Sequence, residues 1–301
     1  MKSIVYIASS NRSGSTLLET LLGKHDCVTS LGELRHLNEY VRDDRLCTCG
    51  NPISVCPFWQ RVETEMRRDG WSLSTMPTKI AGSRSGGGSG LIMIEVLLYL
   101  LSSGLFKIVR KIPFGLRKYI QVAENCLRVA VTVSKVTGCP IIADSSKKPI
   151  MLRLLYLLEP RKLKVVFLIR DVRGVTYSAM RRKIISVREA SYLWLLDNLR
   201  IFLSIQTIPS RQRIVVKYEN FCKDPSLEME RICTFLEIPY VPKTTALSKD
   251  HSHSIGGSPH RFNKAEVQIV LDERWKKELS AEQLMKFGYF PRLLNRLIGY
   301  K

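Results

Sequence analysis

Short, almost wholly apolar segments that alternate with stretches of helical periodicity constrain the fold of this chain more than any other feature. Four segments rich in Ile and Val are predicted strands: Ser3–Ser9, Pro140–Asp144, Lys164–Arg170 and Arg213–Glu219. Apolar residues at helical spacing follow at about Ser15–Lys24 and again at Leu227–Leu236. Apolar strands separated by helices are typical of a parallel sheet with helices on both faces. We therefore predict an α/β fold of three layers, α/β/α, with ligands at the carboxyl ends of the strands.

The length of 301 residues suits one large domain with a substantial core. We expect a single domain over residues 1–301, with a helical insertion or lid at about residues 60–135. Within that insertion, segment 91–118 begins strongly apolar and ends basic. It is either a basic amphipathic surface that contacts an anionic membrane, or a lid, or a pair of ordinary helices that cover the core. Ordinary helices are the commoner arrangement.

The charge balance is unusual, because 47 Lys and Arg residues stand against 27 Asp and Glu residues, a formal net charge of +20. Such a field favours anionic partners, namely phosphorylated cofactors, acidic polymers, nucleic acid or an anionic membrane. Apolar residues make up 45% of the chain, which excludes a disordered polymer. The apolar stretch at the start of the chain is too short for a secretion signal, so we expect a cytoplasmic protein.

The segment between the first predicted strand and the first predicted helix has the composition of an anion-binding loop, Ser9-Ser10-Asn11-Arg12-Ser13-Gly14-Ser15-Thr16. Backbone N–H groups at such a turn and the positive end of the helix attract anions. Compared with the nucleoside-triphosphate loop G-x-x-x-x-G-K-[ST], Ser9 replaces the first Gly and Ser15 replaces the Lys. The missing Lys argues against a kinase that uses Mg-ATP. Arg12 inside the loop suits a donor whose transferred group carries less charge and needs no metal.

The run Arg12-Ser13-Gly14-Ser15-Thr16-Leu17-Leu18 resembles the 5′-phosphosulfate loop of sulfotransferases that use 3′-phosphoadenosine 5′-phosphosulfate (PAPS). The form with Arg is similar to the bacterial, carbohydrate-modifying and tyrosylprotein enzymes. A second motif supports this resemblance: an Arg at a strand end, Arg170, is followed eight residues later by Ser178, as in the 3′-phosphate motif of the family. Arg supplies a bidentate fork for phosphate. The competing interpretation of Arg170 is a salt bridge with a neighbouring carboxylate.

Further segments extend the resemblance, which implies the P-loop-like sulfotransferase fold and PAPS as donor. Arg182 matches another family position, Tyr218 lies in a stretch similar to the family's R/K-Y-E-D-L, and segment 254–262 resembles a glycine-rich loop that closes over the cofactor. Tyr218 is equally compatible with a core position. The resemblance implies these cofactor-binding residues: Arg12, Ser13, Gly14, Ser15, Thr16, Arg170, Ser178, Arg182, Tyr218, Gly257 and Arg261.

Sulfuryl transfer requires a base for the acceptor proton and cations on the sulfuryl and bridging oxygens. Glu33 lies 21 residues after Arg12, in a setting similar to the catalytic Glu of tyrosylprotein-type enzymes, and is the predicted base. The alternatives are a surface Glu at a helix N-terminus and His36 as the base. Lys147 lies in a D-S-S-K stretch that resembles a bacterial motif and is the predicted cation at the bridging oxygen, together with Arg12. Lys148 is the alternative.

Three cysteines, Cys47, Cys49 and Cys56, form the one cluster with the chemistry of a metal site, and Cys27 is a candidate fourth member. Their C-x-C-x6-C spacing differs from the paired C-x2-C of common zinc sites. No fourth ligand is evident from the sequence, so we expect no metal ligands. A structural zinc, a disulfide and free thiols remain open.

The sequence therefore predicts a PAPS-dependent sulfotransferase that requires no metal. Its acceptor is expected to be a hydroxyl or amine of a carbohydrate or small metabolite, and no nucleic acid partner is expected. The alternatives are a nucleotide-dependent kinase on the same architecture and a non-catalytic basic module on nucleotide or membrane. A basic module would need a positive stripe with exposed aromatic side chains.

Overall fold

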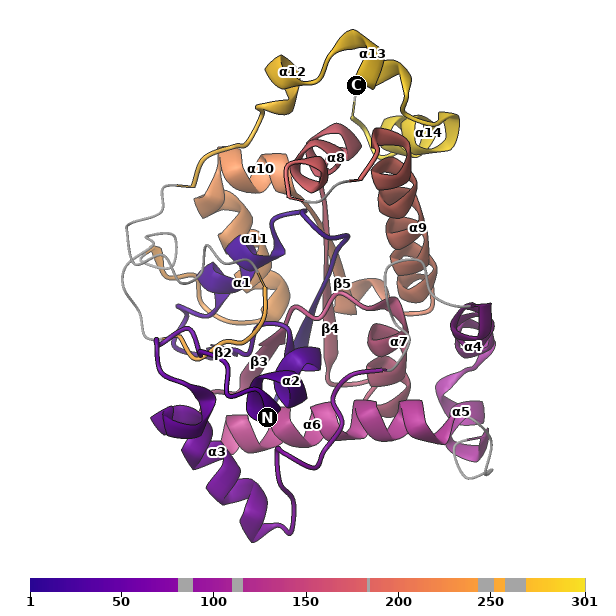
Figure 1. The fold of residues 1–301 in the computed structure, drawn as a ribbon. Coiled ribbons are helices and arrows are strands. Elements are labelled where there is room, and N and C mark those ends of the chain that lie inside the picture. The colour runs from indigo at the N-terminus through magenta and orange to yellow at the C-terminus, as the bar shows by residue number, and fades with distance from the viewer. Residues whose placement is uncertain (81–88, 110–115, 183–184, 243–251, 258–268, 301) are drawn as a thin grey trace.

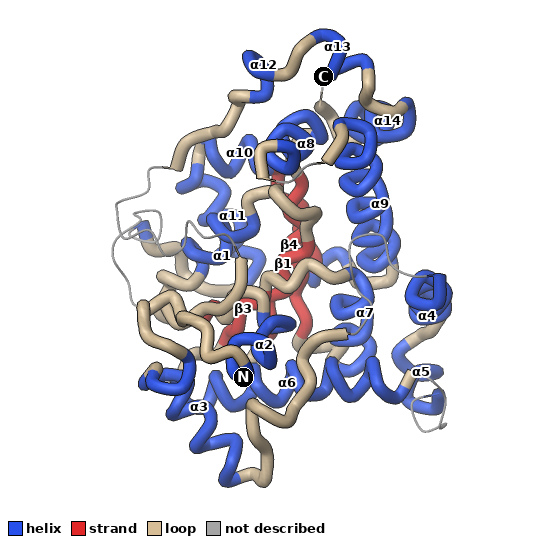
Figure 2. The backbone as a smooth tube through the Cα atoms, in the orientation of Figure 1, coloured by secondary structure: helices blue, strands red, loops and turns tan. Residues whose placement is uncertain are grey.

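The computed structural model describes residues 1–80, 89–109, 116–182, 185–242, 252–257 and 269–300. In this part of the chain, five parallel strands form one sheet in the order β2-β3-β1-β4-β5 (Figures 1 and 2). The strands are β1 (Ser3–Ala8), β2 (Val28–Ser30), β3 (Ile141–Asp144), β4 (Leu163–Ile169) and β5 (Arg213–Lys217). Because β1 pairs with both β3 and β4, the loops after these three strands meet at one edge of the sheet.

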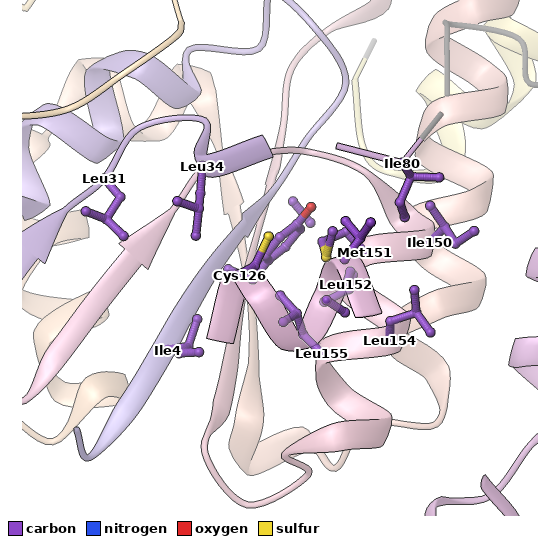
Figure 3. Close-up of a cluster of buried hydrophobic side chains, with 14 of the residues drawn as sticks. Ile4, Leu31, Leu34, Ile80, Cys126, Ile150, Met151, Leu152, Leu154 and Leu155 are labelled. Carbon is purple, nitrogen blue, oxygen red and sulfur yellow. The ribbon is translucent and has the colours of Figure 1, made fainter. Parts of the chain in front are cut away.

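Alternate residues of the strands pack against two helical layers, as the period of two in a strand requires. On β1, Ile4 and Tyr6 face one core while Val5 and Ile7 face the other. The first core contains residues of α6 (Arg117–Thr137), α7 (Pro149–Leu158), α8 (Val172–Met180) and α9 (Val187–Gln206). The second contains residues of α1 (Ser15–Leu22), α10 (Tyr218–Lys223) and α11 (Pro225–Leu236). Figure 3 shows part of the first core, where α7 packs beside Ile4. The predicted three-layer fold is confirmed.

The remaining helices surround these layers (Figure 1). They are α2 (Leu37–Arg42), α3 (Pro57–Arg68), α4 (Ser89–Leu100), α5 (Ser103–Val109), α12 (Trp275–Glu278), α13 (Ala281–Met285) and α14 (Tyr289–Leu297), with the short 3-10 turns η1 (Leu34–His36), η2 (Ile53–Val55) and η3 (Ser210–Gln212). No helix among the described residues is both long enough and apolar enough to cross a membrane.

The four predicted strands are present, with small differences at their ends. The fourth ends at Lys217, so Tyr218 and Glu219 begin α10 rather than close the strand. A fifth strand, Val28–Ser30, is only three residues long and was not predicted. It is held by parallel pairing with β3, a tertiary interaction that local sequence does not encode.

The region of the predicted insertion contains α4, α5, most of α3 and most of α6, whereas residues 69–80 form turns and loop, and α4 packs onto the core. Glu95 is buried and accepts a hydrogen bond of 2.6 Å from Arg200 Nε of α9. Arg153 of α7 is fully buried and donates to the carbonyl oxygens of Leu98 at 2.8 Å and Leu101 at 2.5 Å. The helix is thus attached as an ordinary covering helix. Its outer face is apolar and exposed, at Met93, Val96, Leu97 and Leu100.

We expect Arg153→Met to lower the free energy of unfolding by about 2–4 kcal/mol, because it leaves two helix-end carbonyls buried without their donor. Urea unfolding measures the loss, and hydrogen exchange should show faster exchange of amides in α4. Arg161→Met is the matched control, since Arg161 is exposed and its loss should change stability by less than about 0.5 kcal/mol. Equal stabilities of the two variants would contradict this role for Arg153.

Candidate active site

The candidate site lies where the loops after β1, β3 and β4 converge. The loop after β1 carries Arg12, the loop after β3 carries Lys147, and β4 ends next to Arg170. Two of these residues have backbone strain: φ is 69° at Arg12 and 64° at Lys147. Residues other than glycine rarely adopt this left-handed backbone conformation, and those that do are often found at functional sites.

The loop after β1 has the geometry of an anion cradle. Gly14 caps α1 with φ 90° and ψ 10°, a conformation that glycine adopts without strain. Ser10 and Ser13 are buried and their hydroxyl oxygens are 2.8 Å apart, which closes the turn. The buried Ser9 hydroxyl oxygen has no hydrogen-bond partner within the described structure. A bound anion at the positive end of α1 fits both features.

Tyr218 packs directly on this cradle. A Cβ atom added at Gly14 would lie 2.5 Å from Cδ2 of the Tyr218 ring, so only glycine permits this contact. The guanidinium carbon of Arg170 lies 4.2 Å from the centre of the same ring, on its face. Arg170 Nη1 also donates to the carbonyl oxygen of Arg12 at 3.1 Å. The loop, the ring and Arg170 therefore form one packed unit.

Arg170 also lies close to a carboxylate, as the competing interpretation of a salt bridge expects. Its Nη2 donates to the backbone oxygen of Asp272 at 2.9 Å and lies 3.5 Å from the Asp272 carboxylate. Hydrogen bonds from Arg274, with Arg170 as a further positive charge, lower the pKa of Asp272 to about 2 despite its burial. Arg170 is thus a buried cation with only part of its hydrogen-bonding capacity used by protein groups, as phosphate recognition requires.

Ser178 lies on α8, and the cation Arg182 follows two residues after the end of this helix. A Cβ at Gly174 would lie 2.9 Å from Arg170 Nε, so the face of α8 with Gly174 packs on Arg170. Ser178 is one turn further on that same face. The pKa of Arg12 is lowered by burial and by repulsion from Arg182, while Glu33 acts in the opposite direction. Two cations that repel each other across the loop favour the binding of an anion between them.

Glu33 is the centre of a buried ion cluster. Its carboxylate lies 2.8 Å from Lys147 Nζ, 2.9 Å from Arg35 Nη2 and 3.4 Å from His36 Nε2. Burial alone would raise its pKa, yet Lys147, His36 and Arg35 hold it well below its usual range. Glu33 is therefore ionised at neutral pH and able to accept a proton. The alternative of a surface Glu is wrong, since the residue is buried.

Asp144 holds together the two turns that carry Glu33 and Lys147. One of its carboxylate oxygens accepts from the backbone N–H of Leu34 at 3.3 Å and of Ser146 at 2.8 Å. Burial raises the pKa of Asp144 to about 6, although these hydrogen bonds oppose the shift. The Ser146 hydroxyl oxygen in turn accepts from the N–H of Arg35 at 3.1 Å. The D-S-S-K turn and the turn at Glu33 are thus joined, and Lys147 faces Glu33.

The other predicted residues are placed as follows. The side chain that donates to Glu33 is that of Lys147, at 2.8 Å, whereas the backbone N–H of Lys148 donates to the Tyr6 hydroxyl at 2.8 Å, which favours Lys147 over Lys148. Gly257 is exposed and follows Gly256, whose added Cβ would lie 2.9 Å from Cβ of Glu33. Arg261 lies outside the described residues.

Several residues that shape the site escaped the sequence analysis. Asp272 follows no predicted strand, and the sequence gives Arg35 and Asp144 no role although both contact the site. The position of Asp144 at the end of a buried strand was the one available signal. The guanidinium carbon of Arg173 lies 4.3 Å from the centre of the Trp275 ring.

Gly14→Ala tests the packed unit. Alanine at φ 90° costs about 1–2 kcal/mol in backbone strain, and displacement of the Tyr218 ring adds about 1–3 kcal/mol. Gly138→Ala is the matched control, since Gly138 has φ 75° but nothing within 4 Å of an added Cβ. Urea unfolding should show a larger loss for Gly14→Ala. Equal losses would mean that Tyr218 is not packed on the loop.

Comparison with known proteins agrees with this geometry. Residues 139–242 match the model of the sulfotransferase family, a segment that includes Lys147, Arg170 and Tyr218. Arg12 and Glu33 lie outside this segment. A search of curated protein sequences found no match.

Two solved structures share the fold over nearly the whole chain. The sulfotransferase domain of the Synechococcus PCC 7002 olefin synthase has 20% identity and a TM-score of 0.61, with 99% of this chain and 95% of that chain covered. The sulfotransferase domain from the curacin biosynthetic pathway has 17% identity and a TM-score of 0.56, with 100% and 99% covered. The chain therefore shares the fold of these two sulfotransferase domains, and its segment 139–242, which contains Lys147 and Arg170, matches the model of the sulfotransferase family.

Proposed function

We propose that this protein transfers the sulfuryl group of PAPS to a hydroxyl or amine of a carbohydrate or small metabolite. The observation that carries the proposal is the buried contact of Glu33 with Lys147, a base and a cation brought together between the turn that follows β2 and the loop that follows β3. The match of residues 139–242 to the sulfotransferase family model supports this activity over the kinase and the non-catalytic module.

The donor-binding groups fit a nucleotide with phosphates at both ends of its ribose. The Gly14 turn and Arg12 would hold the 5′-phosphosulfate, and Arg170 with Ser178 and Arg182 would hold the 3′-phosphate. Bound PAPS supplies an activated sulfuryl group, whose bond to the 5′-phosphate oxygen breaks as the bond to the acceptor forms. The Tyr218 ring, fixed between Gly14 and Arg170, supports both binding regions.

Glu33 would take the proton of the acceptor hydroxyl or amine. Its ionised state at neutral pH supplies the free carboxylate that this step needs. Its low pKa also makes Glu33 a weak base as long as the Lys147 ammonium group stays beside its carboxylate. When Lys147 turns from Glu33 toward the bridging oxygen of the donor, the basicity of Glu33 rises and the departing negative charge is neutralised. Arg12 would stabilise the sulfuryl oxygens from the other side.

Four parts of the sequence prediction stay predictions. The acceptor class rests on the resemblance and on the position of Glu33. The cytoplasmic location rests on the sequence alone. Membrane contact through 91–118 is supported by the exposed apolar side chains of α4 and by Lys107 and Lys118 nearby in the chain. The lid role of this region is a proposal of the same kind.

Neighbouring lysines offer the sharpest test. With radiolabelled PAPS and a panel of sugars, alcohols and amines, Lys147→Ala should lower kcat by about 10²–10³-fold, as removal of one transition-state donor does. Lys148→Ala, the matched control, should stay within about threefold, because that side chain is not bonded to Glu33. Similar losses in both variants would contradict the assignment of Lys147.

Two variants distinguish the proposed role of Glu33 in catalysis from that of Arg170 in phosphate binding. Glu33→Gln should lower kcat by about 10²–10⁴-fold and leave the Kd of 3′-phosphoadenosine 5′-phosphate nearly unchanged. Arg170→Ala should raise that Kd by about 10–100-fold, since it removes a charged hydrogen-bond donor. Calorimetry and initial rates measure both effects, and circular dichroism checks folding. The opposite pattern would overturn both roles.

A further inference from the structure

We propose that Cys47, Cys49, Cys56 and His253 form a structural zinc site that fixes segment 252–257 beside Glu33. The sulfur atoms of the three cysteines and a ring nitrogen of His253 all lie within 4.8 Å of one another. Three of these residues are close in sequence, but His253 is 197 residues after Cys56. The fourth ligand that the sequence did not reveal is therefore supplied by the fold.

The distances agree with tetrahedral zinc. Zn–S bonds of about 2.3 Å and Zn–N bonds of about 2.0–2.1 Å place neighbouring ligand atoms about 3.5–3.8 Å apart in a tetrahedron. The Sγ atoms of Cys49 and Cys56 are 3.7 Å apart. His253 Nδ1 lies 3.7 Å from Cys47 Sγ and 3.3 Å from Cys56 Sγ. A disulfide needs about 2.05 Å between sulfur atoms, and all three cysteines are free.

The backbone around the cysteines is shaped to present them inward. Leu46 and Pro52 form an isolated antiparallel bridge, and the N–H of Cys47 donates to the carbonyl oxygen of Asn51 at 2.8 Å. Gly50 has φ 94°, which allows the tight reversal between Cys49 and Asn51. Cys47 and Cys56 are fully buried. A closed loop with buried sulfur ligands is typical of a structural zinc site.

His253 is held in place by contacts other than the sulfur atoms. Its ring stacks on Phe58 with centroids 4.8 Å apart and an angle of 4° between the planes. Thr48, which lies between two of the cysteines, accepts from the N–H of Ser254 and the hydroxyl of Ser252, each at 3.0 Å. The His253 ring is thus oriented before any ion binds, which lowers the entropic cost of coordination.

The site would connect this remote segment to the catalytic base. Two residues after His253, Ile255 donates its N–H to the carbonyl oxygen of Leu31 at 3.0 Å and accepts from the N–H of Glu33 at 2.8 Å. Gly256 then passes so close to Glu33 that a Cβ would not fit. Zinc at the cysteines would therefore anchor one wall of the active site.

The ion would act structurally and take no part in sulfuryl transfer. Four protein ligands complete its tetrahedron, so no position remains for substrate or water. Coordination by three thiolates and a neutral imidazole requires the loss of three thiol protons, so binding should weaken at low pH. Soft thiolate ligands in this geometry favour zinc over magnesium or calcium.

The first test measures the metal content of the full chain, purified without added metal and without a metal-affinity tag. Inductively coupled plasma mass spectrometry should find about one zinc per chain. After chelation, titration with Co²⁺ should produce the visible absorption of a tetrahedral site with thiolate ligands. Lack of zinc in the purified protein together with lack of cobalt binding, or a disulfide among these cysteines, would overturn the proposal.

Variants then assign the ligands. Cys49→Ser should abolish stoichiometric zinc, and His253→Ala should weaken zinc affinity by more than about tenfold. Cys139→Ser and Cys27→Ser are matched controls, because neither cysteine belongs to the cluster, and both should retain one zinc. Retention of full zinc by Cys49→Ser, or its loss from the controls, would contradict the ligand set. Zinc content is measured without PAPS, so the result is independent of the proposed activity.

A second measurement connects the ion with Glu33. Removal of zinc should speed hydrogen exchange of amides in 47–56 and 252–257, while the amides of β1 and β4 keep their protection. The donor product should still bind, because Arg12 and Arg170 do not touch the zinc ligands. Unchanged exchange in 252–257 after zinc removal would show that the ion does not anchor this segment.

Discussion

The parallel pairing of β1 with β3 on one side and β4 on the other brings together three cations of the site. Strands that run in the same direction end at the same edge, so the residues that follow them meet although they are far apart in the chain. Arg12, Lys147 and Arg170 each follow one of these strands. The apolar alternation that fills the two cores therefore also determines where the cations lie.

The cations at this edge are balanced by internal carboxylates. Glu33 neutralises Lys147, and Asp272 lies close to Arg170. These carboxylates offset the cost of burying the two cations, because an unpaired buried charge would be destabilising. An anionic donor that binds here can replace the carboxylate as the ion-pair partner of such a cation. In the case of Lys147, that exchange would free Glu33 to act as a base, so one pair of residues links donor binding to acceptor activation.

The sequence predicts the residues of short binding motifs, but not the contacts between residues that are far apart in the chain. The loop with Arg12 and Gly14 and the strand end at Arg170 follow from short motifs whose geometry is local. The contact of Glu33 with Lys147 joins residues 114 apart, and each was assigned a role without the other. Asp272 and His253 have no local signal, because their partners come from the other end of the chain. The short strand Val28–Ser30 exists only through pairing with β3.

The central claim is that the cations after β1 and β4 recognise a nucleotide with a 3′-phosphate. Calorimetry of the full chain at moderate salt compares 3′-phosphoadenosine 5′-phosphate with ADP and with Mg-ATP. The account predicts clear preference for the 3′-phosphorylated nucleotide without added Mg²⁺, because Arg170 and its neighbours hold a phosphate that ADP lacks. Equal weak binding of all three, falling steeply with salt, would contradict it and indicate a merely basic surface.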